Sequence, residues 1–356
     1  MKRDEEGSEY LNGRGAQLNT DNKYLKHSLA QEHVEGIDDW EISNEKTSFI
    51  IGNSKSIVNK VESPDVGMMY SLNPYQGCEH GCIYCYARNS HEYWGFSAGL
   101  DFERKIIVKK DAPDLFKKFI EKKGWPAYPI SLSGNTDCYQ PCERKYKLTR
   151  QVLEIALDYK QPISLITKNS LILRDIDILQ EMAKYKLVCA FVSITSLDES
   201  LRQKLEPRTT TAKQRFKVIE QLTLANVPMG VMAAPIIPGL NNHEIPVILK
   251  SSADAGAISA GYTVVRLNGV IHQVFEDWLR KNFPDRFEKV WHQIQDCHGG
   301  NVNDSRFGTR MRGEGNFSQM INSIFKLHCK LNNLNVKKIE LNSSQFKKPQ
   351  SQLGLF

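Results

Sequence analysis

Three closely spaced cysteines have the clearest chemical meaning in this sequence. Residues 77–86 read GCEHGCIYCY, so Cys78, Cys82 and Cys85 follow a C-x3-C-x2-C pattern. Three thiolates on one short loop can bind three irons of a [4Fe–4S] cluster and leave the fourth iron without a protein ligand. An open coordination position is where a metal centre binds and activates a second molecule. The pattern therefore predicts a reactive iron–sulfur centre.

Zinc and disulfides are the alternatives for these cysteines. Structural zinc sites usually take four ligands as two close pairs, and the sequence contains no second C-x2-C pair. His80 could supply a fourth ligand, so a zinc-binding nucleic-acid module without catalysis stays open as an alternative. Disulfides are disfavoured because the N-terminus does not resemble a signal peptide.

Residues 77–86, here called the cysteine loop, resemble the cluster-binding loop of the radical S-adenosylmethionine (SAM) superfamily. The flanking stretches, from about residue 71 to 215 and more weakly to 267, resemble spore photoproduct lyase and a largely uncharacterised bacterial branch of its relatives. The resemblance implies that Cys78, Cys82 and Cys85 hold a [4Fe–4S] cluster whose open iron binds SAM. It also implies reductive cleavage of SAM to a 5′-deoxyadenosyl radical, with an electron from a small reductant such as flavodoxin or ferredoxin.

The rest of the pattern indicates an α/β protein that positions this loop. Short apolar runs alternate with longer amphipathic stretches, which is typical of parallel βαβ units. Six such strands match the partial (β/α)6 TIM-type barrel of the resembled family, in which reactive groups collect at the C-terminal ends of the strands. The expected strands are 69–72, 128–133, 163–167, 187–195, 228–235 and 258–267, and the expected helices are 148–159, 171–185, 212–225 and 243–255.

Polar residues at the expected strand ends are the candidate SAM contacts. The resemblance implies that the loop after the second strand contacts the SAM amino group, that a lysine after the third contacts its carboxylate, and that a serine on the fourth also contacts SAM. It places a Pro-Gly turn after the fifth strand and the tyrosines beside the last cysteine near the adenine or the cluster. These candidates are Gly134, Asn135 and Thr136, then Lys168, Ser193, Ile237, Tyr84 and Tyr86.

Two further features bear on the reaction. Glu206 and Arg208 are predicted to pair with one another rather than to take part in catalysis. Spore photoproduct lyase uses a cysteine on its second strand to return a hydrogen atom to the substrate radical, and Asn135 stands at that position here, which puts the lyase reaction in doubt. Cys138 is a candidate hydrogen donor instead. Cys138 and Cys142 could also form a redox pair, bind a second metal or have no function.

The domain organisation follows from composition. We expect a polar, acidic and partly disordered N-terminal extension over residues 1–65, with a β-prone edge element at 47–61. A radical SAM core barrel would span 66–270 and a helical extension 271–340. Aromatic residues at near-helical spacing would pack that extension onto the barrel, namely Trp278, Phe283, Phe287 and Trp291, and a further helix is expected over 317–331. Residues 341–356 are predicted to be a flexible tail.

Charge and the C-terminus point to partners. Residues 1–65 contain eight Lys/Arg and thirteen Asp/Glu and so carry a charge of −5. Because the net charge of the whole chain is +6, the remaining residues carry +11. A basic body suits DNA or RNA, although lysine-rich helix faces can also serve solubility. The final QLGLF resembles the peptide by which bacterial proteins bind the DNA sliding clamp, with Gln352, Leu353, Leu355 and Phe356 as contacts.

Together these features predict a cytoplasmic, oxygen-sensitive radical SAM enzyme of the spore photoproduct lyase type that acts on DNA in repair. Eight cysteines without a secretory signal favour a reducing compartment, and no apolar run approaches the roughly 20 residues of a membrane span. Radical SAM modification of a protein, peptide or small molecule is the first alternative, and the zinc-binding module is the second.

Overall fold

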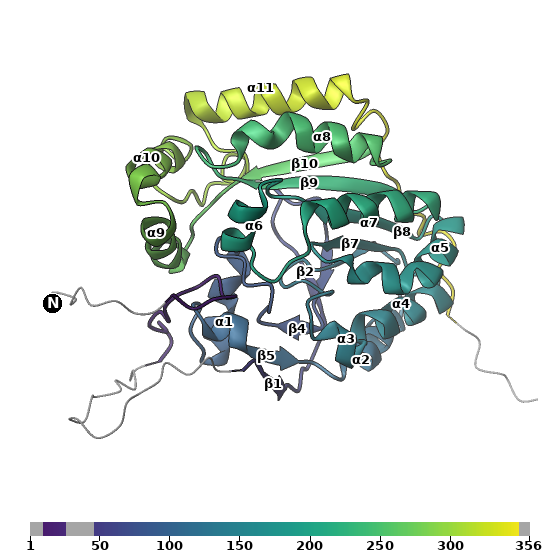
Figure 1. The fold of residues 1–356 in the computed structure, drawn as a ribbon. Helices are drawn as coiled ribbons and strands as arrows, with labels where there is room; N and C mark the ends of the chain where they lie inside the picture. The colour runs from purple at the N-terminus through teal and green to yellow at the C-terminus, as the bar shows by residue number, and fades with distance from the viewer. Residues whose placement is uncertain (1–9, 26–45, 349–356) are drawn as a thin grey trace, which may run out of the picture.

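A seven-stranded sheet forms the centre of the computed structural model, which describes residues 10–25 and 46–348 (Figure 1). The spatial order is β10-β9-β8-β7-β6-β3-β2, in which only β2 is antiparallel to its neighbour. The six parallel strands confirm the predicted partial barrel. The strands are β2 (Val58–Lys60), β3 (Tyr70–Leu72), β6 (Ile130–Leu132), β7 (Ile163–Thr167), β8 (Val188–Ser193), β9 (Met229–Ile236) and β10 (Ser259–Val264).

Helices between the strands cover the outer face of the sheet (Figure 1). Helix α7 illustrates why they form where they do: the Thr211 hydroxyl accepts a hydrogen bond from the Gln214 amide and caps its start, and Val218 and Leu222 are buried on one face. The four predicted helices are confirmed, two of them with a 3-10 turn at the start. They are α4 (Leu148–Asp158), η2 (Ser170–Asp175) with α5 (Ile176–Lys184), α7 (Ala212–Leu224), and η3 (Asn242–Glu244) with α8 (Ile245–Asp254).

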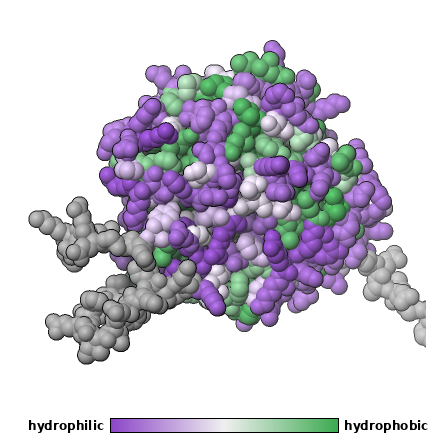
Figure 2. Space-filling view, viewed as in Figure 1, coloured by the Kyte–Doolittle hydropathy of each residue, from purple (hydrophilic) through white to green (hydrophobic). Residues whose placement is uncertain are grey.

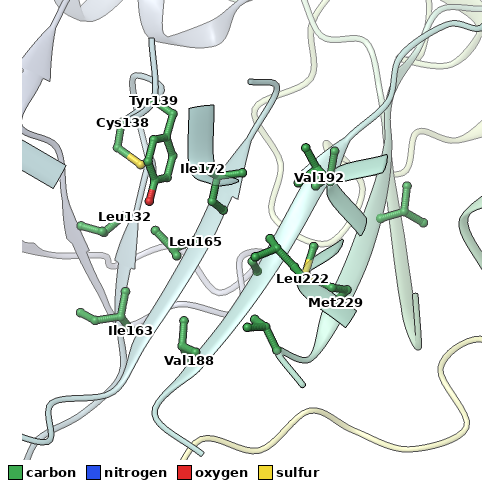
Figure 3. Packing of buried hydrophobic residues seen from close by; sticks show 14 of the residues in the cluster. Leu132, Cys138, Tyr139, Ile163, Leu165, Ile172, Val188, Val192, Leu222 and Met229 are labelled. Atoms are coloured by element: carbon green, nitrogen blue, oxygen red, sulfur yellow. The ribbon is translucent and has the colours of Figure 1, made fainter. Parts of the chain in front are cut away.

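The main hydrophobic core lies between this sheet and its helices (Figure 3). Ile163 and Leu165 of β7 pack there with Val188 of β8 and Leu222 of α7, each at most 2% exposed. Full burial of such side chains contributes about 1.5–3 kcal/mol each. On the face shown in Figure 2, hydrophilic residues predominate and hydrophobic ones are scattered among them.

A second, three-stranded sheet lies beside the barrel and was not predicted. Its order is β1 (Ser48–Ile51), β5 (Lys105–Val108) and β4 (Tyr75–Gln76). The β-prone stretch over 47–61 is therefore divided between two sheets, because β1 pairs with β5 whereas β2 pairs with β3. The remaining segments before β7 are η1 (Tyr86–Trp94), α1 (Asp101–Arg104), α2 (Ala112–Ile120) and α3 (Glu143–Tyr146); α1 lies against β5, whereas α2 packs in the main core.

The helices after the barrel share a core with it. Trp278 is fully buried beside Leu205 and Ile237, and Phe287 is buried in the same group, so the predicted packing of these aromatics is confirmed. None of the helices in residues 10–25 and 46–348 is long and apolar enough to cross a membrane. The helices after the barrel are α9 (Ile271–Asn282), η4 (Pro284–Arg286), α10 (Phe287–Asp296) and α11 (Gly315–Leu331), of which α11 lies against α8 (Figure 1). Leu205 belongs to α6 (Glu199–Leu205), a helix between β8 and β9.

The N-terminal extension differs from its prediction. Arg14, Gly15 and Ala16 are buried, and the Leu18 carbonyl accepts a hydrogen bond from the Leu100 amide at 3.1 Å. Residues 10–25 therefore do not form a poorly ordered segment but lie against the protein with residues 14–16 buried. Residues 1–9 and 26–45 lie outside the described part of the chain.

The start of the predicted flexible tail is also fixed. The Asn342 amide donates to the Lys186 carbonyl at 2.8 Å, and the Lys347 amide donates to the Tyr159 carbonyl at 3.0 Å. Both acceptors precede strands of the main sheet, so this segment lies at the N-terminal ends of the strands. The prediction of a flexible tail is thus wrong up to residue 348, and the clamp-like residues 352–356 lie outside the described residues.

Candidate active site

The cysteine loop follows β4 and is held from two sides. Gly77 and Gly81 adopt φ values of +80° and +69°, which favour glycine and permit the tight turns of the loop. The Cys78 amide donates to the Phe102 carbonyl of α1 at 2.9 Å, and the Ile83 amide donates to the Leu205 carbonyl of α6 at 3.0 Å. The loop conformation is therefore fixed by backbone bonds to α1 and α6.

The three thiols are free of disulfides and shielded from solvent. Cys78 and Cys82 are buried and Cys85 is half-buried. Burial raises the pKa of all three thiols, and the neighbouring negative charges of Asp137, Cys82 and Cys85 raise that of Cys78 further. Thiolates bind metal, so a cluster that binds here has to displace the three thiol protons, and its positive charge would offset the mutual repulsion of the thiolates.

This donor set fits a [4Fe–4S] cluster. A cubane binds each cysteine through a different iron, so it does not require the compact ligand set of a single ion. Among residues 10–25 and 46–348, no three His, Cys, Asp or Glu side chains are arranged to hold a metal ion directly. The assignment of the cluster ligands to Cys78, Cys82 and Cys85 stays a prediction.

His80 does not serve as a fourth zinc ligand in this arrangement. Its Nδ1 lies 3.4 Å from the Asp137 carboxylate, and its Nε2 lies 3.2 Å from the Asn169 side-chain amide. Burial would raise the pKa of Asp137, but the charge and hydrogen bond of His80 outweigh it and lower that pKa to about 2. Asp137 also accepts from the Lys168 backbone amide at 2.9 Å. This carboxylate joins the loop to the ends of β6 and β7, a role that the sequence did not suggest.

Lys168 follows β7, and its ammonium group forms no direct ion pair with another of the described residues. Its side chain is half-buried, and Nζ lies 5.9 Å from the ring centroid of Tyr84. Burial lowers the pKa of Lys168, but the negative charges of Cys82 and Glu206 outweigh it and raise that pKa. A charged, partly desolvated ammonium beside the cysteine loop is suited to bind an anionic group of a ligand.

Glu206 connects the loop to β8 and α7. Its fully buried carboxylate accepts hydrogen bonds from Tyr84, from Thr195 at 2.6 Å and from Arg215 at 2.6 Å. Burial would raise the pKa of Glu206, but Arg215 and Lys168 outweigh it and lower that pKa to about 2. The predicted pair of Glu206 with Arg208 is wrong, because Arg208 instead donates to the Gly13 carbonyl at 3.1 Å. Arg215 is the partner because α7 packs with this side chain buried against the Glu206 carboxylate.

The remaining candidates, at the end of β8 and just after β9, are buried beside this network. The Ser193 hydroxyl donates to the Ala234 carbonyl at 3.1 Å. Ile237 is fully buried in the same hydrophobic group as Cys82 and Tyr84. The structure therefore brings Ser193, Ile237 and Tyr84 to the end of the barrel that holds the cysteine loop, with the hydroxyl of Ser193 already engaged by the protein.

The candidates after β6 meet the loop through Tyr86. The Tyr86 hydroxyl donates to the Gly134 carbonyl at 2.7 Å, and its side chain is 51% exposed. A Cβ on Gly134 would overlap the hydroxyl of Ser71, which explains the glycine. The Asn135 amide group donates to Ser90 at 3.1 Å, and the Thr136 hydroxyl donates to the Tyr75 carbonyl at 2.6 Å. Asn135 and Thr136 thus use their side chains to hold this loop.

Cys138 lies in the main hydrophobic core. The residue has no exposed surface and packs with Leu132, Tyr139 and Leu165 (Figure 3). A thiol that returns hydrogen to a substrate radical has to contact the substrate, so this position argues against the predicted donor role. Cys142 belongs to another buried group, beside Tyr75, so the two thiols occupy separate packing environments.

The parallel partial barrel with a cysteine loop and a basic residue at the C-terminal ends of its strands defines the class of radical SAM proteins. A family model described as "Radical SAM superfamily" matches residues 72–251, half of the chain. The protein belongs to this superfamily, whose members use a [4Fe–4S] cluster and SAM.

Several relatives resemble the chain over most of its length. An uncharacterised protein of Mycobacterium tuberculosis is 31% identical over 234 residues, covering 65% of this chain and 69% of the relative. An uncharacterised protein of Methanocaldococcus jannaschii is 28% identical over 248 residues, covering 69% and 88%. Spore photoproduct lyase, solved in complex with a dinucleoside spore photoproduct, superposes with a TM-score of 0.60 at 14% identity over 84% of this chain and 85% of the lyase. This last likeness shows the fold alone.

Proposed function

We propose that this radical SAM protein cleaves SAM reductively and directs the resulting radical at DNA, in a repair-type reaction. Cys78, Cys82 and Cys85 would hold the cluster. When bound, a [4Fe–4S] cluster with one iron free of protein ligands supplies the electron that splits SAM into methionine and a 5′-deoxyadenosyl radical.

The Lys168 ammonium is the observation that carries the SAM-binding part of the proposal. It lies beside the cysteine loop at the end of β7 and has no ion pair within the described residues. A carboxylate held by such a cation gains a charge-assisted hydrogen bond, worth about 1.5–3 kcal/mol. The chain thus offers a partner for the SAM carboxylate beside the loop that would hold the cluster.

DNA as the substrate is supported by charge and by fold. The chain beyond residue 65 carries +11, and Arg266, just past β10, is a half-buried cation with no ion pair among the described residues. The lyase with the similar fold was solved with a dinucleoside lesion. Asn135 stands where the lyase family has its hydrogen-returning cysteine, and an amide cannot supply that hydrogen atom. We therefore propose a reaction on DNA that ends differently from that of the lyase.

The proposal extends to partners and location. Gln352, Leu353, Leu355 and Phe356 would bind the sliding clamp and bring the enzyme to DNA. A cytoplasmic flavodoxin or ferredoxin would supply the electron. Both interactions suit a thiol-rich protein that works in a reducing compartment.

An anaerobic SAM cleavage assay tests the proposal. The reconstituted protein would be reduced with dithionite, mixed with SAM and assayed for 5′-deoxyadenosine, with ultraviolet-irradiated DNA, intact DNA or no DNA. Cys82→Ala should abolish the product, whereas Cys189→Ala, a packing cysteine on β8, should not. Stimulation by irradiated DNA alone supports the repair reaction. Product without any response to DNA would redirect the search to peptides and small molecules, and the absence of iron and sulfide would refute the radical SAM chemistry.

A further inference from the structure

Part of the N-terminal extension is connected to the cysteine loop by hydrogen bonds through Glu103. Residues 10–20, here called the N-terminal strap, run beside α1 (Figure 1). The Gly15 and Ala16 amides donate to the two Glu103 carboxylate oxygens at 3.1 and 2.8 Å, and the Arg14 guanidinium donates to the Glu103 carbonyl at 3.0 Å. The fully buried carboxylate thereby fixes Gly15 and Ala16, and the backbone carbonyl of the same residue holds Arg14.

The same carboxylate is tied to the loop by Arg88. The Arg88 guanidinium forms a 2.5 Å ion pair with Glu103, and both side chains are completely buried. Its Nε donates to the carbonyl of Cys82, a predicted cluster ligand, at 2.9 Å. Strap, carboxylate, guanidinium and cysteine loop therefore form one continuous hydrogen-bonded chain.

The strap also touches the loop directly. Gly15 approaches Gly81, between Cys78 and Cys82, so closely that a Cβ on Gly15 would overlap the Gly81 carbonyl oxygen. Ala16 has no exposed surface and belongs to the same hydrophobic group as Cys82. The strap therefore covers the loop at Gly81 and packs into the same hydrophobic group as Cys82.

We propose that the N-terminal strap, held in place by Glu103 as its positioning residue, covers the cysteine loop and determines the lifetime of a bound cluster in the presence of oxygen. This inference rests on the proposed function only in taking the loop to hold a [4Fe–4S] cluster. Exposed clusters lose iron when solvent and oxygen reach them, and local opening of a covering segment controls such access. Because strap and loop are linked, a bound cluster should in turn hold the strap in place.

The first test displaces the strap with a single methyl group. Gly15→Ala should take up iron and sulfide anaerobically but lose the cluster in air at least threefold faster than the wild type, followed by absorbance and iron release. Gly67→Ala is the matched control, because a Cβ there meets nothing within 4 Å and neither glycine has a positive φ. Equal cluster lifetimes in the wild type and both variants would overturn the proposal.

The second test needs no mutation. Arg14 is 3% exposed, so trypsin can cut after it only when the strap opens. Cutting at Arg14 should be at least threefold slower in the cluster-loaded protein than in the apoprotein, whereas cutting after the exposed Lys123, in the loop after α2, should not change. Equal rates at Arg14 would show that loop and strap are not linked. Both readouts are independent of SAM cleavage, so a protein without deoxyadenosine product would refute the proposed reaction and still report on the strap.

Discussion

Glu206 and Arg215 form an ion pair at 2.6 Å with both side chains almost wholly excluded from solvent. The pair connects three elements, because the Glu206 carboxylate also accepts from Tyr84 in the cysteine loop and from Thr195 after β8. A buried charge pair with further hydrogen bonds fixes geometry more than it adds stability. The position of Tyr84, and with it the segment between Cys82 and Cys85, therefore depends on this carboxylate.

Glu206→Gln is expected to destabilise the protein by about 3–5 kcal/mol, because Arg215 would remain buried without its counter-charge. Urea unfolding measures the change. Glu199→Gln removes a carboxylate that pairs with Arg202 at 2.6 Å but is 45% exposed, and should cost at most about 1 kcal/mol. Equal losses for the two variants would contradict the role assigned to Glu206.

Acid should weaken the fold through the same carboxylate. The pKa of Glu206 is about 2 in the folded protein against an ordinary value of 4.5. Its stabilising contribution, of order 3 kcal/mol, is fully present above pH 4.5 and is lost as the pH falls toward 2. Stability curves between these pH values should therefore be flatter for Glu206→Gln than for the wild type. A variant as acid-sensitive as the parent would assign the acid response to other groups, such as Asp137.

Lys168→Met is expected to lower SAM affinity about tenfold or more, because the carboxylate would lose its charge-assisted partner. Iron and sulfide content should stay unchanged, since Lys168 is not a predicted cluster ligand. Binding can be measured calorimetrically on the anaerobic, cluster-loaded protein. Lys213→Met on the exposed face of α7 is the control and should bind SAM normally. Unchanged affinity in both variants would remove Lys168 from the site.

The barrel could be predicted from sequence because its strands are apolar runs between amphipathic helices. β7 occupies residues 163–167, as expected, because Ile163, Leu165 and Ile166 form a short apolar run between two helical stretches. The cysteine loop was recognisable because its spacing is dictated by metal chemistry. Both signals are local in the chain.

Long-range polar contacts carried no such signal. Arg208, two residues from Glu206, was the obvious partner in the sequence, yet the fold supplies Arg215 from α7. Glu103 and Arg88 are isolated charges without periodicity in the sequence, and their burial depends on the strap, which comes from a distant part of the chain. The two-residue strand β4 was too short to stand out.

Cys138→Ala tests the buried position of that thiol. A buried cysteine behaves as a small apolar residue, so removal of its sulfur should cost about 1 kcal/mol, seen as a lower unfolding midpoint. Deoxyadenosine formation and any DNA product should be retained. Loss of the DNA product with normal SAM cleavage would restore Cys138 as the hydrogen donor and would require the core around it to open.

Arg266→Gln tests the DNA part of the proposal at the barrel opening. Arg266 lies two residues beyond β10, where the substrate of a partial barrel enters, and its charge has no ion pair in the described structure. If it binds a phosphate, the substitution should weaken oligonucleotide binding about threefold to tenfold and reduce the slope of log affinity against log salt by about 0.7–0.9. Fluorescence anisotropy at several salt concentrations measures both quantities.

Arg286→Gln, which changes an exposed arginine of η4, is the control and should leave the affinity and the salt slope unchanged. Identical slopes for the wild type and Arg266→Gln would exclude a phosphate contact at this residue, because release of a bound counter-ion is unavoidable when a phosphate is neutralised.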